Sequence, residues 1–188
     1  ADPKKVVVAQ VAPAVRAAWG EQLGLAREEA TVGKIMDSLK RMGVDYVFDT
    51  TFSADLTIME EASELIERIT EGNRPLPQFT SCCPAWVKFA ETYYPELLPN
   101  ISTSKSPISM FAPTVKTWFA EKESLDADDI YVVAITPCTA KKFEIMREEL
   151  SDAANYLDRK PGQDCDRVVT TRELASWMRA CNLDLESV

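Results

Sequence analysis

Two short runs of apolar residues, separated by segments with a helical pattern, constrain the fold most strongly. VVVAQVA at Val6–Ala12 and IYVVAI at Ile130–Ile135 have the length of single strands and are apolar almost throughout, as in strands buried on both faces of a sheet. Tyr46–Phe48 and Val168–Val169 are shorter candidates. Strands that alternate with helices favour an α/β fold with a mainly parallel sheet flanked by helices. We expect a single domain over residues 1–188.

Apolar residues at helical spacing predict the connecting helices. We expect one helix from Thr31 to Gly43, one whose apolar stripe is Ile58, Ala62, Leu65 and Ile69, one after Pro84, one around Trp118, and one from Thr139 to Leu150. Ser53 or Asp55 would cap the second of these, which should end at Gly72. Thr170 and Glu173 form a capping-box pattern before a last helix through Cys181, and residues 151–163 read as a polar surface loop.

Charge and residue usage exclude several classes of protein. The chain has 21 Lys and Arg against 30 Asp and Glu, and the net charge of −9 argues against a nucleic-acid partner. No apolar run approaches the roughly 20 residues of a membrane span. Residues 1–5 lack the apolar stretch of a signal peptide, so we expect a cytoplasmic location. Because histidine is absent, histidine-dependent hydrolase triads are excluded within this chain, and a metal site must use thiolate or oxygen ligands.

Five cysteines without secretory features indicate metal or redox chemistry rather than a disulfide framework. The adjacent Cys82 and Cys83 precede Pro84, and Cys138 precedes two lysines. Segments 12–13, 80–83 and 136–138 all follow predicted strands, and ligands of parallel sheets sit beyond the carboxyl ends of strands. We therefore expect one shared site, in which one of the adjacent thiols binds metal while the other has a separate task. Small buried thiols, or a generic thiolate metal or redox protein, are the alternatives.

The same segments resemble the signatures of a known family. TSCCPAW at Thr80–Trp86 resembles the first signature of the FeFe (iron-only) hydrogenases, TSCCPxW, and TPCTAKKFE at Thr136–Glu144 resembles the second, MPCxxKxxE. AQVAPAVR, DLTIMEEASEL, KSP and TTREL extend the likeness in order along nearly the whole chain. The resemblance implies the N-terminal part of the H-cluster catalytic domain, one lobe of a two-lobed structure. It also implies an enzyme that oxidises dihydrogen reversibly to protons and electrons.

The resemblance assigns the cofactor and its contacts. Cys83 and Cys138 would be two of four thiolate ligands to the 4Fe–4S part of the H-cluster. The other part is a diiron subsite with carbon monoxide, cyanide and a bridging dithiolate. Lys141 would donate a hydrogen bond to one cyanide, and Ala12 and Pro13 would approach the second cyanide and the dithiolate.

The resemblance also assigns a proton path. Cys82 would be the proton-delivering thiol, and Glu61, Ser102 and Glu64 would relay protons to solvent. The residue types suit these tasks, because a thiol exchanges protons near neutral pH. Glu61 and Glu64 are three residues apart (64 − 61) and so share one face of a helix. Without the resemblance, both glutamates would read as part of a solvated helix face.

Three departures from the family pattern limit the assignment. Thr136 stands where the second signature has Met, and Ile108-Ser109 follow KSP where the family often has glutamines. The third signature, a Cys-x-x-x-Cys that supplies two more ligands, is missing. Cys165 and Cys181 are 16 residues apart (181 − 165) and cannot replace it, so we expect them to be core thiols.

These departures predict a subunit of a split, multi-subunit hydrogenase. A second subunit would carry the missing Cys-x-x-x-Cys. Iron–sulfur subunits would conduct electrons, and one form of the complex would include a flavin or NAD(P) module. The alternatives are a non-catalytic hydrogen sensor, an iron–sulfur assembly protein, and a truncated piece of a single-chain hydrogenase. Cys82 argues against the assembly class, whose members commonly lack that thiol, whereas Thr136 leaves the sensor open.

Overall fold

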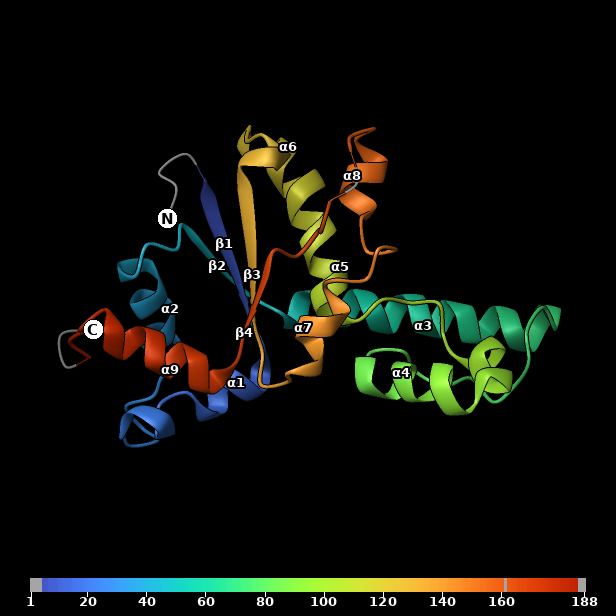
Figure 1. The fold of residues 1–188 in the computed structure, drawn as a ribbon, viewed down its shortest axis with the longest axis horizontal. Coiled ribbons are helices and arrows are strands. Elements are labelled where there is room, and N and C mark those ends of the chain that lie inside the picture. The colour runs from blue at the N-terminus through green and yellow to red at the C-terminus, as the bar shows by residue number, and fades with distance from the viewer. Residues whose placement is uncertain (1–4, 161, 186–188) are drawn as a thin grey trace.

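A four-stranded parallel sheet forms the centre of the molecule (Figure 1). The computed structural model describes residues 5–160 and 162–185. The strands are β1 (Val6–Val11), β2 (Tyr46–Asp49), β3 (Ile130–Ile135) and β4 (Arg167–Val169), in the order β2-β1-β3-β4. β1 and β3 pair along their whole length, from Val6 opposite Ile130 to Val11 opposite Ile135, so their carboxyl ends are level. The predicted parallel α/β fold is confirmed.

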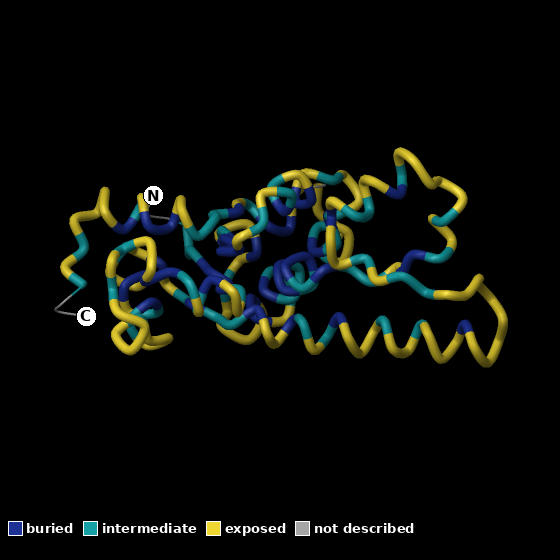
Figure 2. Tube along the Cα trace, turned by 90° about the horizontal axis from the view of Figure 1, so that it is seen from below, coloured by how far each residue is buried: buried dark blue, intermediate teal, exposed yellow. Residues whose placement is uncertain are grey.

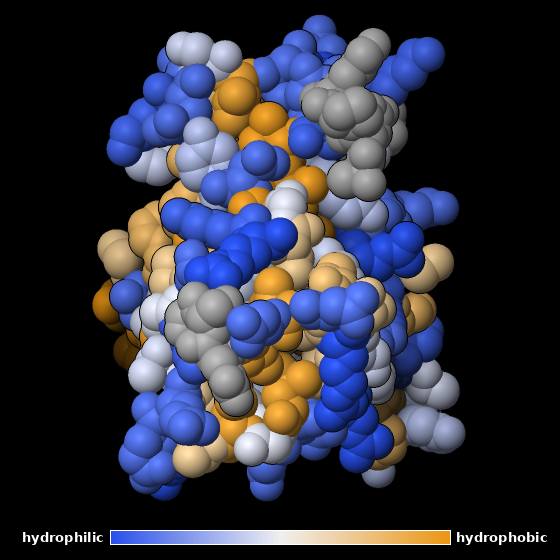
Figure 3. All heavy atoms as spheres, turned by 90° about the vertical axis from the view of Figure 1, so that its left-hand side faces the viewer, coloured by the Kyte–Doolittle hydropathy of each residue, from blue (hydrophilic) through white to orange (hydrophobic). Residues whose placement is uncertain are grey.

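Both faces of the sheet are covered by helices, which explains why β1 and β3 are apolar almost throughout. On one face lie α1 (Pro13–Ala18), α2 (Val32–Arg41) and α9 (Thr171–Ala180), packed against Ala9, Val11, Val133 and Ile135. On the other lie α5 (Pro107–Thr114), the π-helical segment Val115–Phe119 and α6 (Ala120–Glu123), packed against Val8, Val132 and Ala134. Seen from the side that carries α2 and α9, apolar side chains gather between polar ones (Figure 3).

Local sequence signals place the ends of the sheet-covering helices. The Thr31 hydroxyl accepts a hydrogen bond from the backbone N–H of Lys34 at the start of α2. Thr170 and Glu173 form the predicted capping box at the start of α9. Gly43, with φ of 90°, lies in the left-handed region just after α2, where glycine is favoured. The predicted boundaries of these helices are therefore close to those observed.

Helix α3 (Thr51–Glu71) leaves the sheet and forms one side of an arm (Figure 1). It begins at Thr51, directly after β2, rather than at a cap by Ser53 or Asp55. Its apolar stripe is exposed, with 64% of Ile58 and 63% of Ile69 accessible, and Figure 2 shows the exposed side of this long helix along its lower edge. The buried residues of α3 are Ser53, Thr57 and Arg68, because the helix packs on α5 and the arm rather than on the sheet.

The rest of the arm is α4 (Pro84–Tyr93), the 3-10 helix Pro95–Asn100 and the loops that join them. Phe79 makes an isolated parallel bridge with Ile101 and does not belong to the central sheet. The expectation that Thr80–Cys83 follows a strand of the same sheet as the other two segments is therefore wrong. The Thr80–Cys83 loop belongs to the arm, because β2 is the edge strand of the parallel sheet and no strand from the arm pairs with it among the described residues.

Three further expectations need correction. α7 covers only Ala140–Glu144 and not residues 139–150, and α8 (Asp152–Tyr156) lies within the predicted surface loop. α8 starts where the Asp164 carboxylate accepts from the backbone N–H groups of Asp152 and Ala153, a long-range cap that the local pattern does not reveal. Cys165 is buried as expected, but Cys181 is exposed because it follows the end of α9.

Two short 3-10 helices, Glu21–Leu23 and Ala127–Asp129, complete the described elements. Within those same residues no helix is both long and apolar enough to cross a membrane. Residues 1–4, at the N-terminus that is expected to lack a signal peptide, lie outside the described residues, as does Pro161 of the loop expected over residues 151–163.

Candidate functional site

Two of the predicted site segments begin at the same edge of the sheet. The backbone N–H of Ala12 donates to the carbonyl of Ile135 at 2.9 Å, and that of Thr136 donates to the carbonyl of Val169 at 3.0 Å. Ala12 is extended and precedes α1, which has Pro13 in its first turn. The Ala12-Pro13 segment and the loop that carries Cys138 therefore start side by side.

Lys141 joins the second cysteine loop to the first. Its backbone N–H donates to the carbonyl of Cys138 at 3.3 Å, and its Nζ donates to the carbonyl of Cys82 at 2.7 Å. α4 also packs against α7, the helix that carries Lys141. The structure thus brings the Cys82–Cys83 loop of the arm to the edge of the sheet through one buried ammonium group.

The buried charge of Lys141 is balanced by Glu144, one turn along α7. Lys141 Nζ and Glu144 Oε2 are 2.6 Å apart, and only 9% and 5% of these residues are accessible. The hydroxyl of Ser109 donates to Glu144 Oε1 at 2.6 Å, and that of Ser106 donates to the same oxygen. Glu144 ends the second signature but was assigned no task from the sequence, although its spacing of three residues from Lys141 was a usable signal.

The three candidate cysteines are free thiols and are accessible. Cys82 and Cys83 are exposed and Cys138 is partly buried. Cys83 immediately precedes α4, whose N-terminus favours negative charge. The nearby elements α4 and α7 carry exposed Phe89 and Phe143.

These residues fit part of a thiolate cluster site. Accessible thiols beside a buried cation suit an iron–sulfur group with anionic ligands. Within the described residues no three Cys, Asp or Glu side chains converge to hold a metal ion. The described residues therefore offer accessible thiols without a complete set of ligands for a metal ion.

Glu61 lies beside the loop of Cys82. Its Oε1 accepts from the backbone N–H of Ser81 at 3.2 Å, and its backbone carbonyl accepts from the Gln78 side chain at 3.0 Å. Glu61 is partly buried. In the part of the chain that the structure describes, no direct hydrogen bond joins the Glu61 carboxylate to Ser102 or to the Cys82 thiol.

Ser102 and Glu64 are in direct contact further along the arm. The Ser102 hydroxyl donates to Glu64 Oε2 at 2.7 Å, and the backbone N–H of Thr103 donates to the same oxygen at 2.9 Å. Burial acts to raise the pKa of Glu64, but hydrogen bonds from Arg68, Ser102 and Thr103 outweigh it, so the pKa lies below its usual range. Glu64 is therefore an anion at neutral pH.

Arg68 holds this part of the arm together and was missed by the sequence analysis. Its side chain is inaccessible to solvent and donates to Glu64 at 2.6 Å. It also donates to the backbone carbonyls of Pro75, Pro99, Asn100 and Ile101. The Glu64–Arg68 spacing of four residues on one helix was the signal that pointed to it.

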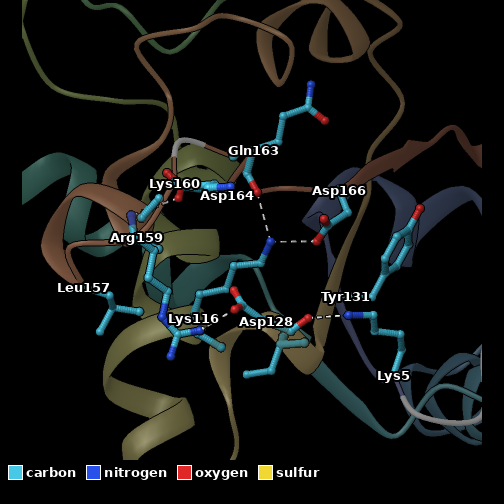
Figure 4. A pocket seen from close by; sticks show the side chains of 15 residues that line it. Lys5, Lys116, Asp128, Tyr131, Leu157, Arg159, Lys160, Gln163, Asp164 and Asp166 are labelled. Atoms are coloured by element: carbon cyan, nitrogen blue, oxygen red, sulfur yellow. Dashed lines mark hydrogen bonds and ion pairs between the residues drawn. The ribbon is translucent and has the colours of Figure 1, made fainter.

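A polar cavity at the opposite end of the strands is separate from these residues (Figure 4). It lies where β3 begins and is lined by charged side chains. Lys116 contacts Asp166 at 2.9 Å and donates to the carbonyl of Gln163 at 2.9 Å, and Arg159 contacts Asp128 at 2.8 Å. These charges already neutralise one another, so we regard the cavity as structural.

A parallel α/β fold with accessible thiols at one edge suits thiolate-based iron–sulfur or redox chemistry. The chain belongs to the iron-only hydrogenase family: residues 5–188 match the family described as "Iron only hydrogenase large subunit, C-terminal domain".

Individual relatives agree with this assignment. The chain is 46% identical over 184 residues to the periplasmic [Fe] hydrogenase large subunit of Nitratidesulfovibrio vulgaris, covering 97% of this chain and 42% of that protein. A solved structure of an apo [FeFe]-hydrogenase HydA1 variant from Chlamydomonas reinhardtii matches with a TM-score of 0.88 and 45% identity, over 100% of this chain and 46% of that one.

A relative of another kind is also similar. The cytosolic Fe-S cluster assembly factor narfl of Danio rerio is 32% identical over 189 residues, covering 98% of this chain and 44% of that protein. The chain spans less than half the length of each of these three proteins.

Proposed function

We propose that this chain is the N-terminal part of the catalytic domain of an FeFe hydrogenase, which oxidises dihydrogen reversibly to protons and electrons. The observation that carries the proposal is the setting of Cys82. Its thiol is exposed, its carbonyl is fixed by Lys141, and the N–H of the preceding residue binds Glu61. An exposed thiol in a loop that also contacts a carboxylate is suited to proton transfer.

In this proposal Cys83 and Cys138 hold the 4Fe–4S part of an H-cluster. Lys141 has N–H donors for an anionic ligand of the diiron subsite, and Ala12 and Pro13 approach that subsite from the end of β1. When bound, the cluster supplies the redox chemistry that splits and forms dihydrogen. The chain's own residues would bind it and move protons.

Protons would move outward along the arm. Cys82 exchanges a proton with Glu61, and Ser102 passes it to Glu64 at the 2.7 Å contact between them. Because the Glu61 carboxylate shares no direct hydrogen bond with the Cys82 thiol or with Ser102 among the described residues, a water molecule would bridge each of these two steps. The low pKa of Glu64 makes it a release group rather than a store of protons.

Two further thiolate ligands must come from outside these 188 residues. We propose that they are the two cysteines of a Cys-x-x-x-Cys motif in a second hydrogenase subunit. The alternative source is a continuation of the same polypeptide. Iron–sulfur subunits would carry the electrons, and one form of the complex would include a flavin or NAD(P) module. A cytoplasmic location stays a prediction, since a similar relative is named a periplasmic hydrogenase.

A non-catalytic role is the second candidate. The similarity to a Fe-S cluster assembly factor and Thr136 in place of Met both favour it. The retained Cys82, Glu61 and Glu64 favour catalysis, because a protein that only binds or senses has no need of a proton path.

The test is to produce this chain with and without the polypeptide that carries Cys-x-x-x-Cys, with anaerobic maturation in both cases. Iron content and hydrogen evolution are then measured. We expect a stable cluster and turnover only in the completed protein. Full activity of the 188-residue chain alone would contradict the need for further ligands. A mature, loaded and inactive complex would favour the sensor, and an inactive protein that transfers clusters would favour the assembly role.

A further inference from the structure

We propose that Ser106 and Ser109 are positioning residues that fix the Lys141 ammonium through the carboxylate of Glu144. The inference deepens the proposed function, on which its connection to the cofactor rests. Its structural part concerns four buried side chains that come from α5 and its preceding residue on one side and from α7 on the other.

Ser106 occupies the N-cap position of α5 but does not cap the helix with its side chain. A serine at this position ordinarily accepts a hydrogen bond from a backbone N–H in the first turn. Here its hydroxyl instead donates to Glu144 Oε1, while its backbone carbonyl accepts from Ser109 and Met110. The start of α5 therefore lacks a side-chain cap from Ser106, and the Ser106 hydroxyl instead hydrogen-bonds to the Glu144 carboxylate.

Ser109 lies in the first turn of α5 and binds the same carboxylate oxygen. Its hydroxyl donates to Glu144 Oε1 at 2.6 Å, and the side chain is buried. Two hydroxyl donors on Oε1 fix the rotation of the carboxylate, so that Oε2 faces Lys141 at 2.6 Å. Hydrogen bonds to a charged group in a buried setting are strong, and their loss leaves part of that charge without a partner.

Lys141 is thereby held at two of its three N–H donors. One donor goes to Glu144 Oε2 and one to the carbonyl of Cys82. Among the described residues the third has no hydrogen-bond partner, so it is available to an anionic ligand of the cofactor. Because Ile108 and Phe111 of α5 are part of the core, the serines tie the direction of the ammonium to the rigid body of the sheet.

The first test uses the chain without any cofactor and measures how accessible Lys141 is. The probe is a small amine-acylating reagent, sulfo-N-hydroxysuccinimide acetate, and the rate of modification of Lys141 is followed by peptide mass spectrometry. Ser109→Ala should raise this rate about tenfold, and Ser106→Ala with Ser109→Ala should raise it further. Ser109→Thr, which retains the hydroxyl, should restore protection.

The matched control is Ser38→Ala. Ser38 is also a fully buried serine, but its hydroxyl has no hydrogen-bond partner within the described residues, so its removal should leave Lys141 protected. The reactivity of the buried Cys165 thiol toward a maleimide, measured on parallel samples, reports global opening. A rise at Lys141 without a matching rise at Cys165 supports the inference. No rise, or equal rises at both residues, overturns it.

The second test uses the completed and matured protein. Ser109→Ala should shift a cyanide stretching band in the infrared spectrum, whereas Ser38→Ala should not. An unshifted band would overturn the part of the inference that concerns the cofactor. Absence of all such bands in the wild-type protein, together with the expected acylation result, would refute the proposed function while the positioning of Lys141 by the serines stands.

Discussion

The Nζ of Lys141 donates to the backbone carbonyl of Cys82 at 2.7 Å across a sequence separation of 59 residues. This contact holds the Cys82–Cys83 loop of the arm against the loop that follows β3. The candidate site is therefore assembled between two parts of the fold, and its geometry depends on where the arm lies relative to the sheet.

Replacing Cys83 or Cys138 by Ser should abolish the 4Fe–4S signal of the completed protein, because iron in such clusters favours thiolate over hydroxyl ligands. Iron content and the paramagnetic spectrum provide the measurement. Cys181→Ser is the matched control, since Cys181 is exposed and lies after α9, outside the proposed site. A cluster that survives both ligand substitutions would show that the assignment is wrong.

Replacing Cys82 by Ser should leave the cluster in place and lower hydrogen turnover by about two orders of magnitude or more, because a serine hydroxyl has a far higher pKa than a thiol. Glu61→Gln should slow turnover more than Glu64→Gln, since water can bypass the outer group more easily. Turnover rates with unchanged iron content check both statements. Wild-type turnover of the Cys82 variant would remove this residue from the mechanism.

Replacing Arg68 by Met should lower the free energy of unfolding by about 3–5 kcal/mol, because it removes the positive charge that pairs with Glu64 and leaves several buried carbonyls without their donor. Chemical denaturation gives the measurement. Arg74→Met is the control: Arg74 is half-exposed, lies 3.6 Å from the same carboxylate, and should cost no more than about 1 kcal/mol. Equal effects of the two substitutions would contradict the central role of Arg68 in the arm.

The buried and the exposed cysteines should differ sharply in reactivity. Burial raises the pKa of the Cys165 thiol to about 12. At a pH of about 7 to 8 the thiol is therefore protonated, and it should resist a maleimide in the native chain. Cys82, Cys83 and Cys181 are exposed and should react rapidly. Mass spectrometry of labelled peptides distinguishes them, and labelling in denaturant shows that Cys165 is chemically competent. Rapid native labelling of Cys165 would disprove its burial.

Glu173 should contribute to stability in a defined range of pH. Hydrogen bonds from Lys142 and from the Thr170 backbone lower its pKa from 4.5 to about 2. Because the folded pKa lies below the unfolded value, the contribution is complete above about pH 4.5 and is lost as the pH falls toward 2. Glu173→Ala should lower the free energy of unfolding by about 1 kcal/mol at pH 7, and this difference should shrink at pH 2. If the loss of unfolding free energy in the Glu173 variant were the same at pH 7 and pH 2, the contribution could not come from the ionised Glu173 carboxylate.

Features that depend on a few neighbouring residues were predictable. The apolar runs of β1 and β3 indicated strands covered on both faces, and the capping box at Thr170 marked the start of α9. The two cysteine signatures and the departure at Thr136 could also be identified from the sequence, because each lies within one short continuous segment. Even the Lys141–Glu144 and Glu64–Arg68 pairs follow helical spacing, although their importance became clear only from their burial.

The sequence by itself determined the alternation of strands and helices around β1 and β3, the parallel class of the sheet and the family to which the chain belongs, because these depend on local periodicity and short motifs. Only the tertiary structure decided that Cys165 is buried while Cys181 is exposed, that the stripe of α3 faces outward, and that Ser106 binds Glu144 rather than capping its helix. The physical reason is that burial and buried hydrogen bonds are set by residues far apart in the chain, whose approach no local pattern records.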